Sequence, residues 1–266
     1  MNAEYIKVIQ SELNKIKKTN LTVDGILGAG TMAQINNILD IPIQWDTERK
    51  VVATLQWICK YHELDVGEID GYFGDQTESC YDDLVVLLST GKLPEPFRTE
   101  APPLSRIKAP SKWPLQTTAE LNKFYGPVGT GQVLVKVPYP LKIAWNTTQI
   151  ANKIQCHSKI ADSVLHVLEQ TKAYYGDDID DLGLDLYGGC LNVRKMRGGT
   201  NYSVHSWGSA IDWHPTANKL KQNHTTACFA KPVYDKWWSF WEAEGAVSLG
   251  RACDFDWMHV QFARLK

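Results

Sequence analysis

An internal repeat occupies the first part of the chain, residues 1–90, with a period of about 46 residues. Five positions carry the same residue in both copies: Gln10 and Gln56, Asp24 and Asp70, Gly25 and Gly71, Gly28 and Gly74, and Thr31 and Thr77. A repeat of this length is one supersecondary unit used twice, because both copies must fold in the same way. The repeat therefore restricts residues 1–90 to two copies of one small motif.

Each copy begins with the pattern of an amphipathic helix. The apolar residues of one helical face are Tyr5, Ile6, Ile9, Leu13 and Ile16 in the first copy, and Val51, Val52, Leu55 and Cys59 in the second. An Asp-Gly turn follows, and Thr31 or Thr77 is placed to cap the next helix. We therefore predict that residues 1–90 are entirely α-helical.

Prolines interrupt the chain directly after the repeat. They are Pro94, Pro96, Pro102, Pro103, Pro110 and Pro114. Such a composition is typical of a semi-rigid tether, because proline fixes the backbone and cannot continue a helix. We expect three segments: a helical module over 1–90, a linker over 91–114 and a second domain over 115–266.

The second domain has the pattern of an α+β fold. Helices are predicted over 120–125, 162–175 and 231–243, and strands over 133–137 and 183–187. Two further short strands, 210–213 and 257–262, are rich in β-branched and aromatic residues. The aromatic stripe of the last helix favours a core position, and His62, His157 and His224 are interpreted as structural or surface residues.

Two imidazoles and one carboxylate are placed to bind a metal ion. Asp212 and His259 fall in the two short strands, and His205 lies in the preceding loop. This ligand set suits zinc and leaves a fourth tetrahedral position open, which is typical of catalytic rather than structural sites. We predict one Zn²⁺ per chain, held by His205, Asp212 and His259.

Asp256 lies three residues before His259 and is not needed as a ligand. A carboxylate beside a water of lowered pKa can take its proton as a general base and return it to a leaving amine. The pattern therefore indicates a hydrolase that acts on an amide, with Asp256 as its base.

The motifs Ser203–Asp212 (S-x-H-x-x-G-x-A-x-D) and Asp256–His259 (D-W-M-H) resemble those of the LAS metallopeptidases of peptidoglycan. The run from Gly188 to Gly199 is similar to the VanY-like phage branch, which contains L-alanyl-D-glutamate endopeptidases. The resemblance extends over roughly residues 113–266. It implies a small antiparallel sheet, the same three zinc ligands and the same base.

The resemblance also implies an arginine upstream of the first ligand that stabilises the tetrahedral intermediate. Arg194 and Arg197 both fit this region. An arginine already in place when charge develops stabilises an oxyanion strongly. Both residues therefore remain candidates, with a pair of surface cations as the alternative.

Five neighbours of these motifs are predicted to contact substrate: Ser203, Trp207, His214, Trp257 and Gln261. His214 follows Asp212 by two positions, so a continuing strand would place both side chains on one face. We interpret His214 as a residue at the rim of the cleft.

The repeated segment D-G-x-x-G-x-x-T is similar to the peptidoglycan-binding domain 1 family, a small helical module. The resemblance implies that residues 1–90 bind peptidoglycan, as one joined bundle or two modules. A tethered wall-binding module would keep a peptidase near its substrate and raise its effective concentration.

Composition excludes several other classes of function. The formal net charge of −2 argues against nucleic-acid binding. No basic segment followed by an apolar one opens the chain, and no apolar run is long enough to span a bilayer, so we expect neither a signal peptide nor membrane insertion. The six scattered cysteines favour reduced thiols.

Together these features predict a monomeric phage-type endolysin, an L-Ala–D-Glu endopeptidase made in the host cytoplasm and released to the cell wall through a holin. The alternatives are a D,D-carboxypeptidase, a non-catalytic wall-binding protein, and a glycosidase with paired carboxylates, for which no motif singles out an acidic pair.

Overall fold

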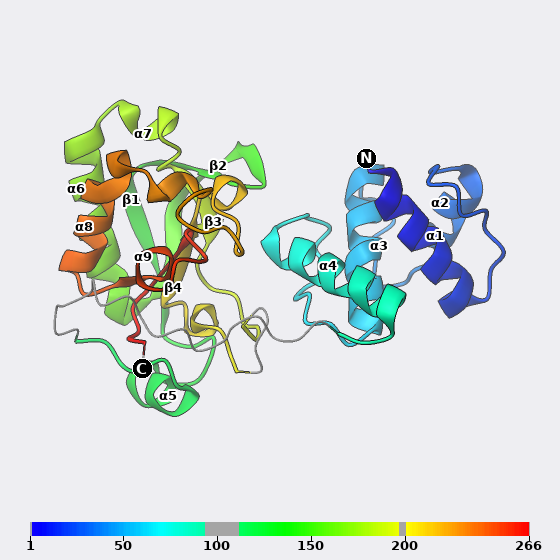
Figure 1. The fold of residues 1–266 in the computed structure, drawn as a ribbon, viewed down its shortest axis with the longest axis horizontal. Helices are drawn as coiled ribbons and strands as arrows, with labels where there is room; N and C mark the ends of the chain where they lie inside the picture. The colour runs from blue at the N-terminus through cyan, green and yellow to red at the C-terminus, as the bar shows by residue number, and fades with distance from the viewer. Residues whose placement is uncertain (1, 94–111, 197–200, 266) are drawn as a thin grey trace. The chain divides into compact units, whose positions relative to one another are not determined.

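The computed structural model describes residues 2–93, 112–196 and 201–265. The chain divides into two compact units, Met1–Glu95 and Pro96–Lys266, each with its own hydrophobic core. Most of the predicted linker lies outside the described residues. Figure 1 shows both units and labels their helices and most of their strands.

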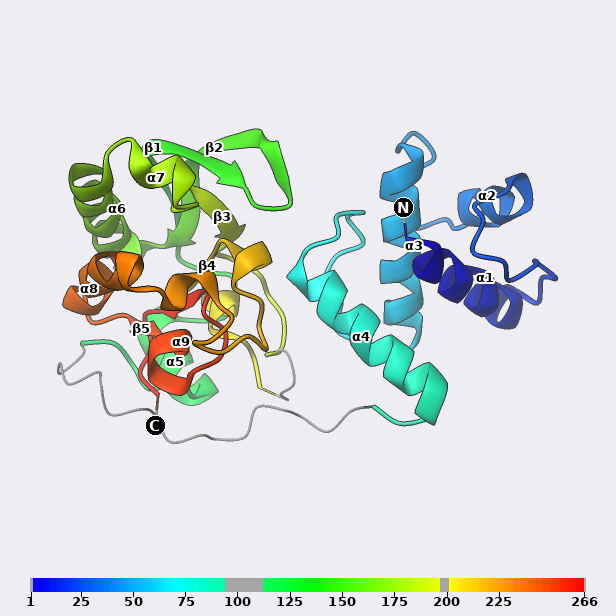
Figure 2. The same cartoon turned by 45° about the horizontal axis from the view of Figure 1, so that its top comes forward.

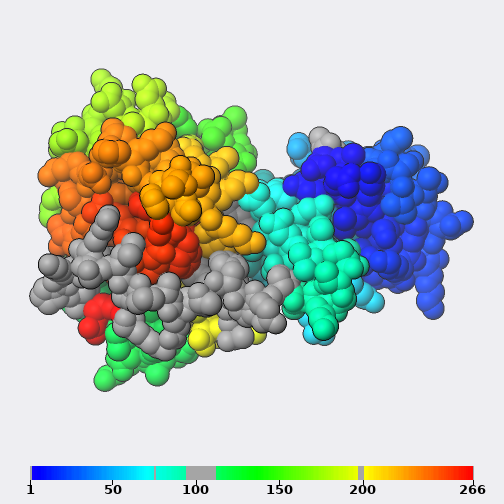
Figure 3. All heavy atoms as spheres, viewed as in Figure 1, coloured from blue at the N-terminus to red at the C-terminus, as the bar shows by residue number. Residues whose placement is uncertain are grey.

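The described part of the N-terminal unit contains four helices: α1 (Ala3–Lys17), α2 (Ala29–Asn36), α3 (Thr47–Tyr61) and α4 (Asp75–Thr90). Asn2 and Asp46 cap α1 and α3, because each side chain accepts a hydrogen bond from a backbone N–H of the first turn. α3 contacts the three other helices and lies between α1 and α4 (Figure 2). Side chains fill the spaces between these ribbons (Figure 3).

Gln10 holds the first Asp-Gly turn against α1. Its side-chain nitrogen donates to Asp24 Oδ1 (2.9 Å), the Ile26 carbonyl (3.0 Å) and Thr31 Oγ1 (3.3 Å). Its oxygen accepts from the Gly25 N–H (2.9 Å). Gln10 is 2% exposed, so its amide replaces the water that these turn groups lose.

The second copy repeats this arrangement at positions 46 residues later, as the sequence predicts. Gln56 donates to Asp70 Oδ1 (2.8 Å), the Tyr72 carbonyl (3.2 Å) and Thr77 Oγ1 (3.0 Å), and it accepts from the Gly71 N–H (2.8 Å). The sequence repeat is therefore also a repeat in structure, and the residues shared by both copies form the Asp-Gly turn and its contacts.

The predicted capping role of Thr31 and Thr77 is wrong. Gly28 and Gly74 occupy the cap positions of α2 and α4, without a side-chain cap. Each threonine lies inside the first turn, and its hydroxyl accepts from the glutamine of the preceding helix. Each threonine therefore links its own helix to the preceding helix instead of capping a helix end.

The C-terminal unit contains a six-stranded sheet in the order β2-β1-β3-β4-β6-β5. The strands are β1 (Gln132–Ile143), β2 (Asn146–His157), β3 (Leu186–Gly189), β4 (Ala210–Trp213), β5 (Val247–Ser248) and β6 (His259–Gln261). The α+β class is confirmed, but the sheet is mixed rather than antiparallel, since β1 pairs with β3 in parallel. A helical connection follows β2, and after it β3 runs in the same direction as β1.

The helices of this unit are α5 (Thr118–Tyr125), α6 (Ala161–Tyr175), α7 (Asp178–Asp181), α8 (Asp235–Ala243) and α9 (Leu249–Cys253). α6 and α8 lie side by side against one face of the sheet (Figures 1 and 2). The predicted helix 231–243 is shorter than expected, because Pro232 opens a separate 3₁₀ turn, Pro232–Tyr234. The aromatic side chains of α8 lie in the hydrophobic core, since Trp237, Trp238 and Trp241 are at most 1% exposed.

The predicted strand 183–187 lies three residues later in the structure, at Leu186–Gly189. Gly183 has a φ of +65° and turns the chain after α7, so the strand begins beyond it. Among the described residues, no helix is long and apolar enough to cross a membrane.

Candidate metal centre

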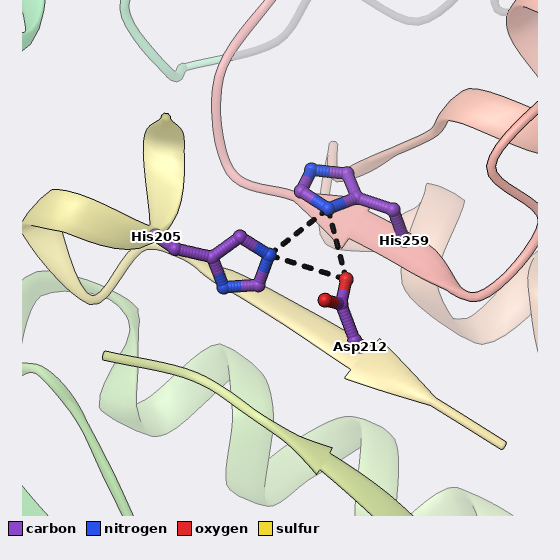
Figure 4. A group of neighbouring side chains, drawn as sticks. All are labelled: His205, Asp212 and His259. Atoms are coloured by element: carbon purple, nitrogen blue, oxygen red, sulfur yellow. Dashed lines mark hydrogen bonds and ion pairs between the residues drawn. The ribbon is translucent and has the colours of Figure 1, made fainter. Parts of the chain in front are cut away.

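His205, Asp212 and His259 converge on one point from three segments of the C-terminal unit (Figure 4). Asp212 and His259 are register partners across the antiparallel strands β4 and β6. His205 lies in the 3₁₀ turn Val204–Trp207, which Ser203 caps by accepting from the His205 N–H. All three side chains are buried. The sequence prediction that these residues meet in space is therefore correct.

The three facing atoms form a nearly equilateral triangle. His205 Nε2 lies 3.1 Å from both Asp212 Oδ1 and His259 Nδ1, and His259 Nδ1 lies 3.0 Å from Asp212 Oδ1. Ligands of a tetrahedral zinc ion with bonds of 2.0–2.1 Å are about 3.3 Å apart. The triangle therefore has nearly the size of one face of such a tetrahedron.

A backbone carbonyl fixes the tautomer of His205. Its Nδ1 lies 2.7 Å from the Cys190 carbonyl oxygen, which can only accept, so Nδ1 carries the proton. The lone pair is then on Nε2, the atom that faces Asp212 and His259. A partner of this kind is the usual support of a metal-binding histidine.

A glutamine fixes the tautomer of His259. The Gln261 amide nitrogen donates to Gln116 Oε1 (2.8 Å) and to the Ala263 carbonyl (3.0 Å), which turns the Gln261 oxygen toward His259 Nε2 (3.1 Å). His259 Nε2 therefore carries the proton, and the lone pair is on Nδ1. Gln261 thus serves as a positioning residue.

With these tautomers, two nitrogen lone pairs and a carboxylate oxygen point at one another without a hydrogen between them. Such an arrangement is repulsive unless a cation lies among the three atoms. The donor set therefore fits a metal ion, and it matches the nitrogen and oxygen ligands that zinc accepts in tetrahedral sites.

The charge states of the site agree with this interpretation. Burial lowers the pKa of His205 and favours the neutral ring that binds metals, although Asp212 opposes this effect. Burial would raise the pKa of Asp212, but positive charge on the side of His205 and His259 holds it well below the ordinary value, and with both rings neutral a metal ion among the three atoms would supply that charge. Asp212 is therefore an ionised carboxylate.

A small cleft opens beside the triad and encloses about 10 Å³, room for one ion or water molecule. Its lining consists of Gln116, Arg194, Met196, Ser203, Val204, Asp212, Asp256, His259 and Gln261. The predicted base and one predicted arginine thus share a cleft with two of the predicted ligands.

Asp256 is 3% exposed and has a φ of +56°, a conformation that costs free energy for most residues but less for aspartate and asparagine. Two backbone hydrogen bonds hold it there: its N–H donates to the Leu220 carbonyl (2.9 Å), and its carbonyl accepts from the His259 N–H (3.0 Å). The same turn therefore positions the carboxylate of Asp256 and the ring of His259.

Only one of the two candidate arginines, Arg194, lies within the described residues. Arg194 is 6% exposed and lines the cleft, and Ser206 and Ser203 bond to its backbone. Its Nη1 donates to the Lys195 carbonyl (3.0 Å). Arg197 lies outside the described residues. Of the two, Arg194 has an observed position beside the triad.

Ser203 and Gln261 line the cleft, but three other residues predicted to contact substrate do not belong to its lining. Trp207 is fully buried and donates to Asn122 and to the Gly126 carbonyl. The Trp257 ring packs on Gly250.

His214 does not share the strand face of Asp212. β4 ends at Trp213, and His214 adopts a φ of +45° that turns its side chain out of the strand pattern. Its ring packs against Phe229 and close to Gly183 instead. The predicted strand face is therefore wrong for His214, and its predicted contact with substrate stays a prediction.

The sequence reasoning missed Gln116 and Met196, which both line the cleft. Gln116 reaches it because Leu115 forms a parallel bridge with Arg264, next to the end of β6. Met196 Sδ lies 3.3 Å from the Gln116 amide nitrogen. No local motif marks either residue, because a long-range pairing brings Gln116 to the site.

A comparison with protein families, curated proteins and solved structures found no match to this chain.

Proposed function

We propose that this protein is a zinc-dependent amide hydrolase that cuts the stem peptide of peptidoglycan, most specifically the L-Ala–D-Glu bond, as a phage-type endolysin. One observation carries the proposal: two histidines with fixed tautomers and the carboxylate of Asp212 converge next to a second buried carboxylate, Asp256, in one cleft. Together these groups supply a metal site and a proton acceptor.

His205, Asp212 and His259 would hold the zinc ion. When bound, zinc lowers the pKa of a water molecule and polarises a carbonyl group. The protein determines where this chemistry takes place, because β4, β6 and the 3₁₀ turn fix the three ligands, and Cys190 and Gln261 fix the ring tautomers.

Asp256 would accept the proton of the attacking water and return it to the leaving amine nitrogen. Arg194 lines the same cleft and would donate to the oxygen of the scissile carbonyl as negative charge develops there. Ser203 lines the same cleft, and its hydroxyl would bond to the peptide backbone. These roles account for every charged residue in the cleft lining.

For the N-terminal unit, residues 1–90, we propose wall binding, joined through residues 91–114 to the peptidase domain at 115–266. The support is the resemblance of the repeat to peptidoglycan-binding modules, together with its preserved turn framework in both copies. A wall-binding module would raise the effective concentration of the peptidase at its substrate.

The proposal is tested by mass spectrometry of purified peptidoglycan digested with the protein, with and without a zinc chelator. We expect a new N-terminus at D-Glu that disappears with chelator and returns with added zinc. Loss of terminal D-Ala alone would instead identify a D,D-carboxypeptidase. Absence of cleavage by protein that still pellets with the wall would refute hydrolysis and leave a binding protein.

A further inference from the structure

A second cleft lies on the surface of the N-terminal unit, and Ile69 of its lining directly precedes the Asp-Gly turn of the second repeat. It is lined by Asp40, Trp57, Lys60, Tyr61, Glu68 and Ile69 and has a volume of about 510 Å³. This volume falls within the range of about 300–1,000 Å³ that is typical of small-ligand sites. Its lining combines two aromatic rings with side chains of both charges.

The two aromatic side chains form a continuous surface along α3. Trp57 and Tyr61 are one helical turn apart, their ring centroids are 6.1 Å apart, and their planes differ by 32°. Tyr61 is 57% exposed. Lys17 donates to the Asn37 carbonyl (2.9 Å) and holds its ammonium group 5.6 Å from the centre of the Trp57 ring. Contacts within the unit thus hold the Trp57 ring in place.

The first copy of the repeat builds the same turn framework without aromatic residues at the equivalent positions. The positions 46 residues earlier are Ser11 and Lys15, on the corresponding face of α1. The glutamine framework is nevertheless complete in the first copy. An aromatic pair that only one copy carries, and that exposes a tyrosine to water, is more consistent with ligand binding than with stabilisation of the motif.

The charges around the cleft favour an uncharged ligand. The carboxylates of Asp40 and Glu68 are balanced by the ammonium groups of Lys60 in the lining and of Lys17 beside the Trp57 ring, so neither a polyanion nor a polycation would meet charges of the opposite sign alone. A sugar ring has a flat face of C–H groups that stacks on aromatic rings, and hydroxyl or acetamido groups that bond to charged side chains at its edge. The cleft offers both kinds of contact.

We propose that Trp57 and Tyr61 bind the N-acetylated sugars of the peptidoglycan glycan strand. This inference rests on the proposed wall-binding role of the N-terminal unit, and it deepens that role by assigning recognition to the glycan rather than to the stem peptide. The sugar rings would stack on the aromatic pair, and Asp40, Lys60 and Glu68 would bond to their polar groups.

The probe is the β-1,4-linked tetramer of N-acetylglucosamine, titrated against the full-length protein while saturation transfer to its acetyl methyl groups is recorded by NMR. We expect binding by the wild type and roughly tenfold weaker binding by Trp57→Ala and by Tyr61→Ala, the loss of about 1.4 kcal/mol that a stacking contact contributes. Trp145→Ala is the matched control, because Trp145 is an exposed tryptophan (43%) of the other unit.

Tyr61→Ala keeps the test informative if Trp57→Ala unfolds, since the tyrosine is largely exposed. Unchanged binding in Tyr61→Ala, or no binding by the wild type, would overturn the proposal. Binding of a soluble stem tetrapeptide that is lost in Tyr61→Ala would overturn it in favour of a peptide site.

The stem-peptide digestion separates this inference from the proposed function. If Tyr61→Ala cleaves soluble stem peptide like the wild type but loses the sugar, both proposals stand. Sugar binding without any peptide cleavage would support the glycan site and refute the peptidase. Peptide cleavage without sugar binding would support the peptidase and refute the glycan site.

Discussion

Asp212 and His259 face each other across the β4–β6 pair, and their side-chain atoms Oδ1 and Nδ1 lie 3.0 Å apart. Register partners on antiparallel strands project to the same side of a sheet, so backbone pairing alone brings these two side chains together. His205 completes the group from a short turn. The metal site is therefore built mostly from rigid backbone, which favours tight and specific binding of an ion.

Replacing Asp256 tests the general base. Asp256→Asn retains a residue that tolerates the positive φ of this position, but its amide cannot accept the proton. We expect hydrolysis of stem peptide to fall by about 10²- to 10⁴-fold while zinc content stays at the wild-type level. Steady-state rates and metal analysis of the same preparation measure both. Full activity in Asp256→Asn would show that another group is the base.

Removing the side-chain support of His259 should weaken metal binding. Gln261→Met keeps the volume but loses the oxygen that accepts from His259 Nε2. Because the ring can then adopt the other tautomer, we expect zinc affinity to fall roughly 10- to 100-fold. Competition with a chromophoric chelator measures the change. Gln155→Met, on an exposed position of β2, is the control, and an equal loss there would count against a specific role of Gln261.

The two arginines can be distinguished by rate. Arg194→Ala removes a donor from the cleft, and we expect kcat to fall about 10²- to 10³-fold with zinc still bound. Arg197→Ala should change kcat much less. Single-turnover kinetics on a soluble stem peptide compare the two variants. A large loss in Arg197→Ala with normal turnover in Arg194→Ala would reverse the assignment.

His157 predicts acid sensitivity of the C-terminal unit. Burial lowers the pKa of His157, whose neutral ring donates from Nε2 to the Tyr125 carbonyl (2.8 Å) and accepts the Lys159 N–H at Nδ1 (3.1 Å). Because the folded pKa is the lower one, its stabilisation is present above the ordinary pKa of about 6.5 and is lost as the pH falls through the folded value. Denaturant unfolding between pH 7.5 and pH 5 should show this loss.

The matched variant for this experiment is His157→Gln, which can replace a hydrogen bond but does not titrate in this range. We expect it to be less stable than the wild type at pH 7.5 by on the order of 1 kcal/mol and to lose less stability on acidification. Equal pH dependence in both proteins would assign the acid sensitivity to other groups.

The ligands of the metal site and the strand 210–213 were predictable because their signals are local, whereas β6 (His259–Gln261) covers only the middle of the predicted strand 257–262. Ala210–Trp213 carries a strand pattern of its own, and Asp212 and His259 occupy equivalent places in two such patterns. The repeat was equally visible, since Gln10 and Gln56 recur with their partners at a constant spacing. In these cases the residues that define an element also determine its contacts.

Other features depend on contacts between distant residues or on single backbone angles. Gln116 contacts Gln261, 145 positions away, through a pairing that no pattern around Gln116 indicates. His214 leaves the strand face because of its positive φ, which is unusual for a histidine. Thr31 looked like a helix cap, but Gln10 bonds to its hydroxyl from another helix. Tertiary packing decides such details.

Zinc content and ligand type test the central claim most directly. Elemental analysis and X-ray absorption of the purified protein should show one zinc per chain with nitrogen and oxygen neighbours at about 2.0–2.2 Å, and His205→Ala should lose the metal. Protein that binds no zinc after incubation with excess ion, or a metal with sulfur neighbours, would contradict the site formed by His205, Asp212 and His259.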